Sequence, residues 1–280
     1  MKNKYVDSSP LTMKEIQMVS LEILKKVADI CDKEGLRYNL TWGTLIGAIR
    51  HHGYIPWDDD VDILMPRQDY NKLKEYFLIH ENEVAPLALF DDKTPDYPYL
   101  CARVSNNDYY IDTDNEKPCG MGIFIDIYLL DGTGDTEEEA WHYASKMCKY
   151  PRLIFLATRK RLVLWTTKGL LRKMAKVVLF TYAKLRGKSY FEKKLMSKID
   201  VESYDKKQYV GCVSWCERPK YSVIKKDEFE DTIDVQFEKY LFKCPRKYDK
   251  YLRMWYGDYM QLPPEKDRIY QHLYKAYKKQ

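Results

Sequence analysis

An acidic run at the mouth of an apolar segment constrains this chain more than any other feature of its sequence. Residues 58–62 read Asp-Asp-Asp-Val-Asp, and the apolar residues 63–65 follow directly. Alternate side chains of a strand share a face, so Asp60 and Asp62 would point together, away from the apolar side chains. Carboxylates held that close repel one another unless a cation lies between them. Oxygen ligands at the mouth of a strand suit a hard divalent ion such as Mg²⁺, shared with a substrate phosphate.

Two other interpretations of the acidic run are an exposed loop and a calcium loop. Acidic runs usually form solvated loops, but this one leads straight into an apolar strand. The calcium loop of an EF-hand needs glycine at its sixth position and glutamate at its twelfth, where Ile63 and Asp69 stand instead. We therefore prefer metal-assisted chemistry on a phosphate, with the exposed loop as the alternative.

The composition is that of a folded chain without a membrane-spanning segment. Its 280 residues are 45% hydrophobic, which is enough for a large core. The first residues lack the apolar stretch of a signal peptide, and no apolar run approaches the roughly 20 residues that cross a bilayer. We therefore expect one domain over residues 1–280 in the cytoplasm, with a peripheral contact at the inner face of the membrane left open.

A basic segment interrupts the otherwise mixed charge pattern. Residues 140–191 contain no Asp or Glu, while Lys and Arg recur throughout among apolar residues. Such a segment is typical of an amphipathic helix on an anionic membrane surface, and equally of a packed helical hairpin with a basic solvent face. No recognised motif for binding nucleic acid accompanies the charge, so we expect no nucleic-acid partner. We expect a basic helical insertion over residues 136–201, and the choice between membrane surface and structural hairpin stays open.

Local patterns predict helices and strands in irregular alternation. A capping box at Thr12 begins a helix that ends at Gly35, and a short strand follows over residues 36–40. Residues 122–130 form an apolar strand with Asp126 in its middle, and a second extended segment covers residues 235–242. The fold class is therefore α+β, or mixed α/β.

Three features along this order indicate a phosphate site. Gly43 and Thr44 lie between a strand and a helix start, where free backbone N–H groups can hold a phosphate. Asp60 and Asp62 follow on a second strand. Asp126 would be a buried aspartate, which needs a partner or a metal ion. This order is that of the polymerase-β-type nucleotidyltransferase core, where metal ions on three carboxylates act on a phosphorus centre.

A close resemblance to the signature of the LicD family is carried by residues 41–63, which read Thr-Trp-Gly-Thr-Leu-Ile-Gly-Ala-Ile-Arg-His-His-Gly-Tyr-Ile-Pro-Trp-Asp-Asp-Asp-Val-Asp-Ile. It extends through Phe-Ile-Asp-Ile at 124–127 to Tyr-Gly-Asp-Tyr-Met-Gln-Leu-Pro-Pro at 256–264. The family holds bacterial phosphocholine transferases and is related to fukutin-type ribitol-phosphate transferases. The resemblance implies a metal-dependent phosphotransferase, which moves phosphocholine from CDP-choline to a sugar hydroxyl of a surface glycan and releases CMP. The acceptor would be a lipid-linked precursor of teichoic acid in the cell wall or of lipopolysaccharide.

The same resemblance implies roles for four aspartates. Asp60 and Asp62 match the metal-binding pair, for Mg²⁺ or Mn²⁺, and Asp126 matches the third carboxylate. Asp58 matches a further acidic position, and either Asp58 or Asp126 would accept the proton of the attacking hydroxyl if it is free of metal. The alternatives are a CDP-ribitol or CDP-glycerol donor, a nucleotidyltransferase that releases pyrophosphate, and a non-catalytic membrane scaffold.

Three further side chains are candidates for binding the substrate. Arg50, after the short helix, and Arg103, within an apolar strand, would each pair with the pyrophosphate, with a structural role as the alternative. Trp57 would stack on cytosine or form part of a cage for a quaternary ammonium group, with packing as its alternative.

Overall fold

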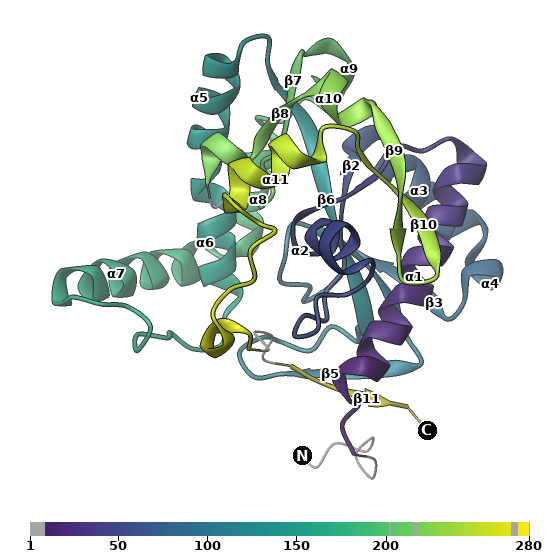
Figure 1. The fold of residues 1–280 in the computed structure, drawn as a ribbon. Helices are drawn as coiled ribbons and strands as arrows, with labels where there is room; N and C mark the ends of the chain where they lie inside the picture. The colour runs from purple at the N-terminus through teal and green to yellow at the C-terminus, as the bar shows by residue number, and fades with distance from the viewer. Residues whose placement is uncertain (1–8, 202, 216–217, 270–273, 280) are drawn as a thin grey trace.

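The apolar segment that contains Asp126 forms the central strand of the main sheet (Figure 1). The computed structural model describes residues 9–201, 203–215, 218–269 and 274–279. Within them the sheet has seven strands: β1 (Asn39–Leu40), β2 (Asp62–Pro66), β3 (Leu87–Phe90), β4 (Ala102–Asn106), β6 (Ile123–Gly134), β7 (Tyr209–Cys212) and β8 (Val223–Lys225). Strand β6 is parallel to β2 and antiparallel to β4, and its far end pairs with β7. The central position of β6 places Asp126 between two neighbouring strands.

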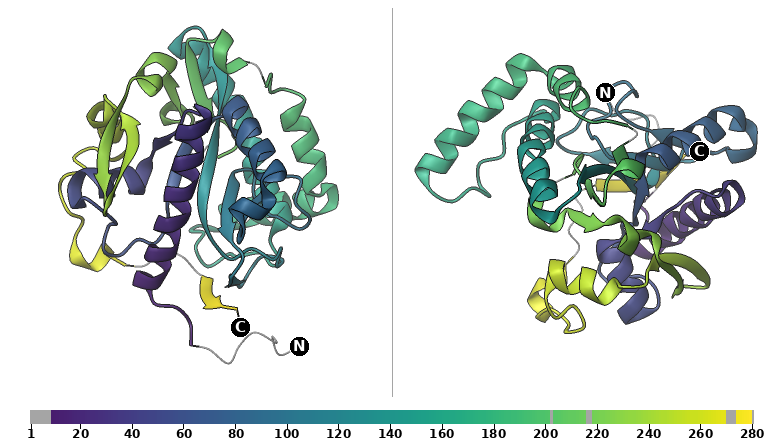
Figure 2. Two further views of the ribbon diagram at one scale, coloured as in Figure 1. Left: turned by 90° about the vertical axis from the view of Figure 1, so that its right-hand side faces the viewer. Right: turned by 90° about the horizontal axis from the view of Figure 1, so that it is seen from above.

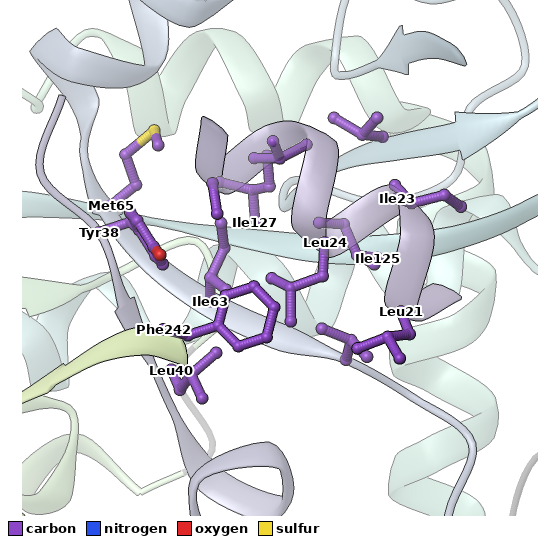
Figure 3. Packing of buried hydrophobic residues seen from close by; sticks show 14 of the residues in the cluster. Leu21, Ile23, Leu24, Tyr38, Leu40, Ile63, Met65, Ile125, Ile127 and Phe242 are labelled. Carbon is purple, nitrogen blue, oxygen red and sulfur yellow. The ribbon is translucent and has the colours of Figure 1, made fainter. Parts of the chain in front are cut away.

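Helix α1 (Met13–Glu34) covers one face of this sheet. Its Leu24 lies in one buried cluster with Ile63 of β2 and Ile127 of β6 (Figure 3). The predicted capping box is confirmed, since Thr12 accepts the Glu15 N–H at 3.3 Å and Glu15 accepts the Thr12 N–H at 2.7 Å. Because successive strand residues alternate, the side chains between these apolar ones point to the opposite face of the sheet.

Shorter elements surround the sheet. Strands β9 (Thr232–Phe237) and β10 (Tyr240–Pro245) form a hairpin, and β5 (Tyr109–Thr113) pairs with β11 (Tyr274–Lys278). The helices outside the basic segment are α2 (Trp42–Ile46), the π-helical turn η1 (Gly47–His51), α3 (Arg67–Ile79), α4 (Glu81–Val84), α10 (Lys226–Glu230), α11 (Tyr248–Tyr256) and the 3-10 turns η2 (Pro219–Tyr221) and η3 (Glu265–Asp267).

The basic segment between β6 and β7 is helical. It contains α5 (Glu137–Met147), α6 (Lys149–Thr158), α7 (Leu170–Arg186), α8 (Lys188–Met196) and α9 (Ser203–Lys206). Ile154, Phe191 and Leu195 form a buried cluster of their own, which reaches the rest of the molecule through Val213. Helix α7 extends away from the sheet in both Figure 1 and Figure 2. The division into one domain with an insertion over residues 136–201 stays a prediction.

The mixed α/β class is confirmed, and three local expectations need correction. The strand expected over residues 36–40 has only the two residues of β1, and the expected extended segment at 235–242 is the β9–β10 hairpin. The regular strand begins at Asp62, so Asp60 precedes it.

The polymerase-β-type relationship stays a prediction. No helix among the described residues is both long enough and apolar enough to span a bilayer.

Candidate active site

Three neighbouring strands place three charged side chains in one row. Asp62 of β2 is opposite Asp126 of β6, and Asp126 is opposite Arg103 of β4. Directly opposed residues of a sheet point to the same face, and α1 covers the other face. The expected meeting of the second and third carboxylates therefore follows from the strand register.

Arg103 and Asp126 form a buried ion pair. The guanidinium Nε of Arg103 donates to Asp126 at 2.6 Å, and both side chains are almost fully buried. The guanidinium lies 4.2 Å from the ring centroid of Tyr99 and 3.8 Å from that of Phe124. Burial by itself lowers the pKa of Arg103, but the charge of Asp126, together with those of Tyr97, Tyr99 and Cys101, holds that pKa well above its usual value. Arg103 was expected to bind phosphate; in this structure it neutralises and orients Asp126.

Asp62 is a buried carboxylate whose negative charge is not balanced by a hydrogen bond from the described part of the chain to each of its oxygens. Its Oδ1 atom is buried and has no hydrogen-bond partner among the described residues. Burial, together with the charges of Asp60, Asp126 and Asp58, raises the pKa of Asp62 well above its ordinary value. Its backbone N–H donates to the Thr44 hydroxyl at 2.8 Å, which fixes the start of β2 against α2. A buried, unpartnered carboxylate oxygen among like charges is the donor atom that a cation satisfies.

The described residues provide only part of a binding site for a metal ion. The described residues contain no ready group of three or more His, Cys, Asp or Glu side chains that could hold an ion. Asp60 and Asp62 supply oxygen ligands of the type that Mg²⁺ takes, and substrate phosphate oxygens commonly complete such a site. Asp126 is held by Arg103 instead, so its role as a third ligand stays a prediction.

The acidic run divides between the cavity and the core. Asp58 and Asp60 line the same cavity as Asp62, and the alternation had predicted a common direction for Asp60 and Asp62. Asp59 is buried and accepts a hydrogen bond from the Tyr274 hydroxyl at 2.7 Å. At Gly43, an added Cβ would lie 2.9 Å from a carboxylate oxygen of Asp58, so a larger residue there would displace that carboxylate.

The cavity in front of these carboxylates has a volume of about 620 Å³ and is rich in aromatic side chains. The Trp42 ring meets the Tyr128 ring edge-on at 4.5 Å and the Trp255 ring at 5.9 Å, and Tyr128 meets Trp215 at 6.3 Å. Burial and the nearby aspartates raise the pKa of Tyr128 and Tyr256, so both phenols stay protonated at neutral pH. The aromatic lining consists of Trp42, Trp57, Tyr99, Tyr128, Phe155, Trp215, Trp255 and Tyr256. Aromatic faces attract cations, and a quaternary ammonium group is a characteristic ligand of such a lining.

The structure brings most of the predicted substrate residues to this cavity, with two exceptions. Gly43 and Trp57 line it, together with Arg103. Thr44 does not line it, because its hydroxyl is engaged by the Asp62 N–H. Arg50 is also outside the lining; its guanidinium donates to the Tyr259 carbonyl at 2.5 Å, which holds the C-terminal segment in place.

Four functional candidates could not be recognised in the sequence. Trp42 is part of the family signature, but the sequence does not show that its side chain lines the cavity. Its backbone φ of 43° is also unusual for a residue other than glycine. Trp215, Trp255 and Phe155 come from segments with no local motif. The indole N–H groups of Trp42 and Trp255 are buried without a partner among the described residues, which makes them available donors.

Comparison with known proteins identifies the family. A family model described as "LicD/FKTN/FKRP, nucleotidyltransferase domain" matches residues 35–166. The lipopolysaccharide cholinephosphotransferase LicD of Haemophilus influenzae is 30% identical over 281 residues, which cover 95% of this chain and 98% of that protein. The chain belongs to the LicD family. An uncharacterized protein of Rickettsia typhi is 30% identical over 90 residues, or 32% of this chain and 24% of its own length. One from Rickettsia prowazekii is 37% identical over 54 residues, or 19% of this chain and 20% of its own length.

Only part of the cavity lining of this LicD-family protein lies within the residues that the family model matches. The carboxylates, Arg103 and Phe155 lie within residues 35–166, whereas Trp215, Trp255 and Tyr256 lie beyond them. The C-terminal third thus completes the aromatic lining of the cavity.

Proposed function

We propose that this protein transfers phosphocholine from CDP-choline to a sugar hydroxyl of a surface-glycan precursor and releases CMP. The observation that carries the proposal is the cavity that combines four neighbouring acidic positions with an aromatic wall. Family membership supports the reaction type, and the relative from Haemophilus influenzae is named for the same transferred group. We place the reaction in the cytoplasm, with a precursor of lipopolysaccharide or teichoic acid as the acceptor.

The aromatic wall gives the donor its orientation. Trp42, Tyr128 and Trp215 present ring faces and edges around one volume, which suits the trimethylammonium group of choline. Trp57, whose ring has the guanidinium of Arg268 5.6 Å from its centroid, is the proposed stacking surface for cytosine. The diphosphate then lies toward the carboxylates.

The carboxylates provide the chemistry. Asp60 and Asp62 would hold Mg²⁺ or Mn²⁺, which when bound neutralises the charge of the diphosphate. The acceptor oxygen forms a bond to the phosphorus that carries choline, and the bond from that phosphorus to the CMP oxygen breaks. Asp58 accepts the proton of the acceptor hydroxyl, because the oxygens of Asp126 are engaged by Arg103.

The test is ³¹P NMR of the purified protein with Mg²⁺, a lipid-linked glycan extract and one donor at a time. CMP and a new phosphodiester signal from CDP-choline, both absent in Asp60→Ala/Asp62→Ala, are expected. Turnover of CDP-ribitol or CDP-glycerol, without turnover of CDP-choline, would show that the proposed donor is wrong and that the proposed mechanism still holds. Pyrophosphate as the product from a nucleoside triphosphate would replace the mechanism as well.

A further inference from the structure

Helix α7 carries a continuous apolar stripe that the described residues leave largely exposed, although the Tyr182 ring meets the Phe191 ring at 5.7 Å. The stripe consists of Leu171, Met174, Val178, Tyr182 and Leu185, spaced three or four residues apart and therefore on one side of the helix. Three of its members are strongly exposed: Leu171 at 83%, Val178 at 67% and Leu185 at 82%. Ala183 is the only buried residue of the helix. An apolar stripe of this length on a projecting helix calls for a partner.

The charges of the same helix indicate what the partner is. Arg172, Lys173, Lys184 and Arg186 are exposed on the same helix, away from the stripe. Within the described part of the chain, no ion pair joins a basic side chain of α7 to an acid, and residues 140–191 contain no Asp or Glu. The excess of positive charge favours an anionic surface, and the stripe favours an apolar interior behind it.

We propose that α7, with the preceding residues 162–169, forms an arm that lies flat on an anionic lipid bilayer. The stripe would enter the boundary between headgroups and acyl chains, and the basic side chains would contact the anionic headgroups. Trp165, which is 75% exposed in the same arm, is an aromatic side chain suited to that boundary. The helix is not both long enough and apolar enough to cross the bilayer.

A second copy of the chain is a poorer partner for this arm. Two arms packed stripe to stripe would bring cations close to cations, with no Asp or Glu in either arm to neutralise them. An anionic bilayer satisfies both the apolar and the charged groups.

The arm borders a second cavity that adjoins the catalytic cavity. This second cavity of about 450 Å³ lies between the arm and the sheet, and Lys176 and Phe180 of α7 line it. Tyr99, Arg103 and Phe155 line both cavities. On the proposed function, a lipid-linked acceptor held in the bilayer would therefore reach the carboxylates through this second cavity.

Vesicle flotation tests the arm without any substrate. We expect the wild-type protein to float with phosphatidylcholine vesicles that contain phosphatidylglycerol, and about tenfold less with phosphatidylcholine alone. The stripe variant Leu171→Ser/Val178→Ser/Leu185→Ser should lose binding by about tenfold. The matched control Leu78→Ser/Ile79→Ser, which changes residues on α3 that are 72% and 68% exposed, should float like the wild type.

Circular dichroism establishes that the variants are folded, so their flotation can be compared directly. No flotation of the wild type, or equal flotation of the wild type and the stripe variant, overturns the arm. A dimer in light scattering that the stripe variant dissociates overturns it in favour of a second copy. Flotation without phosphocholine transfer supports the arm and overturns the proposed function, so the two proposals fail separately.

Discussion

Asp126 lies between a positive and a negative neighbour, Arg103 on one strand and Asp62 on the other. Replacing Arg103 with Met leaves the buried Asp126 carboxylate without its partner. We expect Arg103→Met to lower the free energy of unfolding by about 3–5 kcal/mol, because an unpaired buried charge is costly. Urea denaturation measures this change.

The double variant Arg103→Met/Asp126→Asn separates charge from packing. It removes both charges, so we expect it to recover a large part of the stability that Arg103→Met loses. Equal instability of the single and double variants would show that Arg103 acts by packing between Tyr99 and Phe124 instead.

Asp62 has the opposite energetic character, because its charge is buried among like charges. We expect Asp62→Asn to raise the free energy of unfolding of the metal-free protein by about 1–2 kcal/mol and to abolish transfer. Excess Mg²⁺ should stabilise the wild type and leave the variant unchanged. Thermal denaturation with EDTA and with Mg²⁺ measures both effects; equal stabilisation of the two proteins by Mg²⁺ would remove Asp62 from the metal site.

The aromatic wall allows a prediction about the donor. Trp215 is half-buried at the edge of the wall, so Trp215→Leu should leave the fold intact. We expect its KM for CDP-choline to rise about tenfold, since an aromatic face contributes about 1–2 kcal/mol to a desolvated cation. Trp141→Leu, at a half-exposed site on α5, is the control. An equal rise of KM for CDP-glycerol would show that Trp215 contacts a part common to both donors.

At the scale of elements, sequence reasoning succeeded where the signal was local. The Thr12 capping box, the positive φ of 65° at Gly35 and the alternation within the acidic run each depend on a few neighbouring residues. The β9–β10 hairpin was missed because its turn contains Glu238 at a φ of 55°, where a glycine or asparagine would have signalled it. The β5–β11 pairing joins segments about 160 residues apart, and no local pattern encodes it.

The same difference between local and long-range signals applies to the residues of the site. The common cavity of Asp60 and Asp62 could be predicted from their spacing, although the regular strand begins only at Asp62, and Asp126 could be predicted because a charge in an apolar strand needs a partner. Arg103 was expected to face the substrate, yet only the register with β6 shows that its partner is Asp126. Trp215 and Trp255 join the cavity through tertiary packing alone.

The contact between α3 and β3 gives a prediction about pH. Asp91, at the end of β3, accepts hydrogen bonds from Tyr70 at 2.8 Å and from Lys74, both on α3. Burial raises the pKa of Asp91, but the bonds from Lys74, Tyr70 and the Lys93 N–H outweigh burial and hold it below its ordinary value of 3.8. The stability that Asp91 contributes is therefore present above pH 3.8 and is lost as the pH falls through the folded-state pKa.

Asp91→Asn should accordingly lower the free energy of unfolding by about 1–3 kcal/mol at pH 7, with a smaller difference from the wild type in acid. Urea denaturation from pH 7 downward measures the difference. A difference that grows as the pH falls would contradict this account of the α3–β3 contact.

At the scale of the whole molecule, the chain separates opposite charges. Four carboxylates line the cavity on one face of the sheet, whereas residues 140–191, which include the arm that extends from the sheet in Figure 1, contain no Asp or Glu. The two cavities share Tyr99, Arg103 and Phe155, so the arm and the carboxylates are linked by a short path. This arrangement suits an enzyme whose charged donor arrives from water and whose acceptor is held at a membrane.

The last prediction follows from that arrangement and compares two forms of one acceptor. The arm variant Arg172→Glu/Lys173→Glu/Lys184→Glu reverses exposed charges that lie outside the lining of the catalytic cavity. We expect its kcat/KM to fall about a hundredfold for a lipid-linked glycan in anionic vesicles, since three basic residues near such a surface contribute about 1 kcal/mol each. For the same glycan cleaved from its lipid, kcat/KM should match that of the wild type. Added salt should weaken the wild type toward the variant on vesicles, because it screens exposed charges. An equal loss on both acceptors would mean that the arm shapes the catalytic site itself and does not act through the membrane.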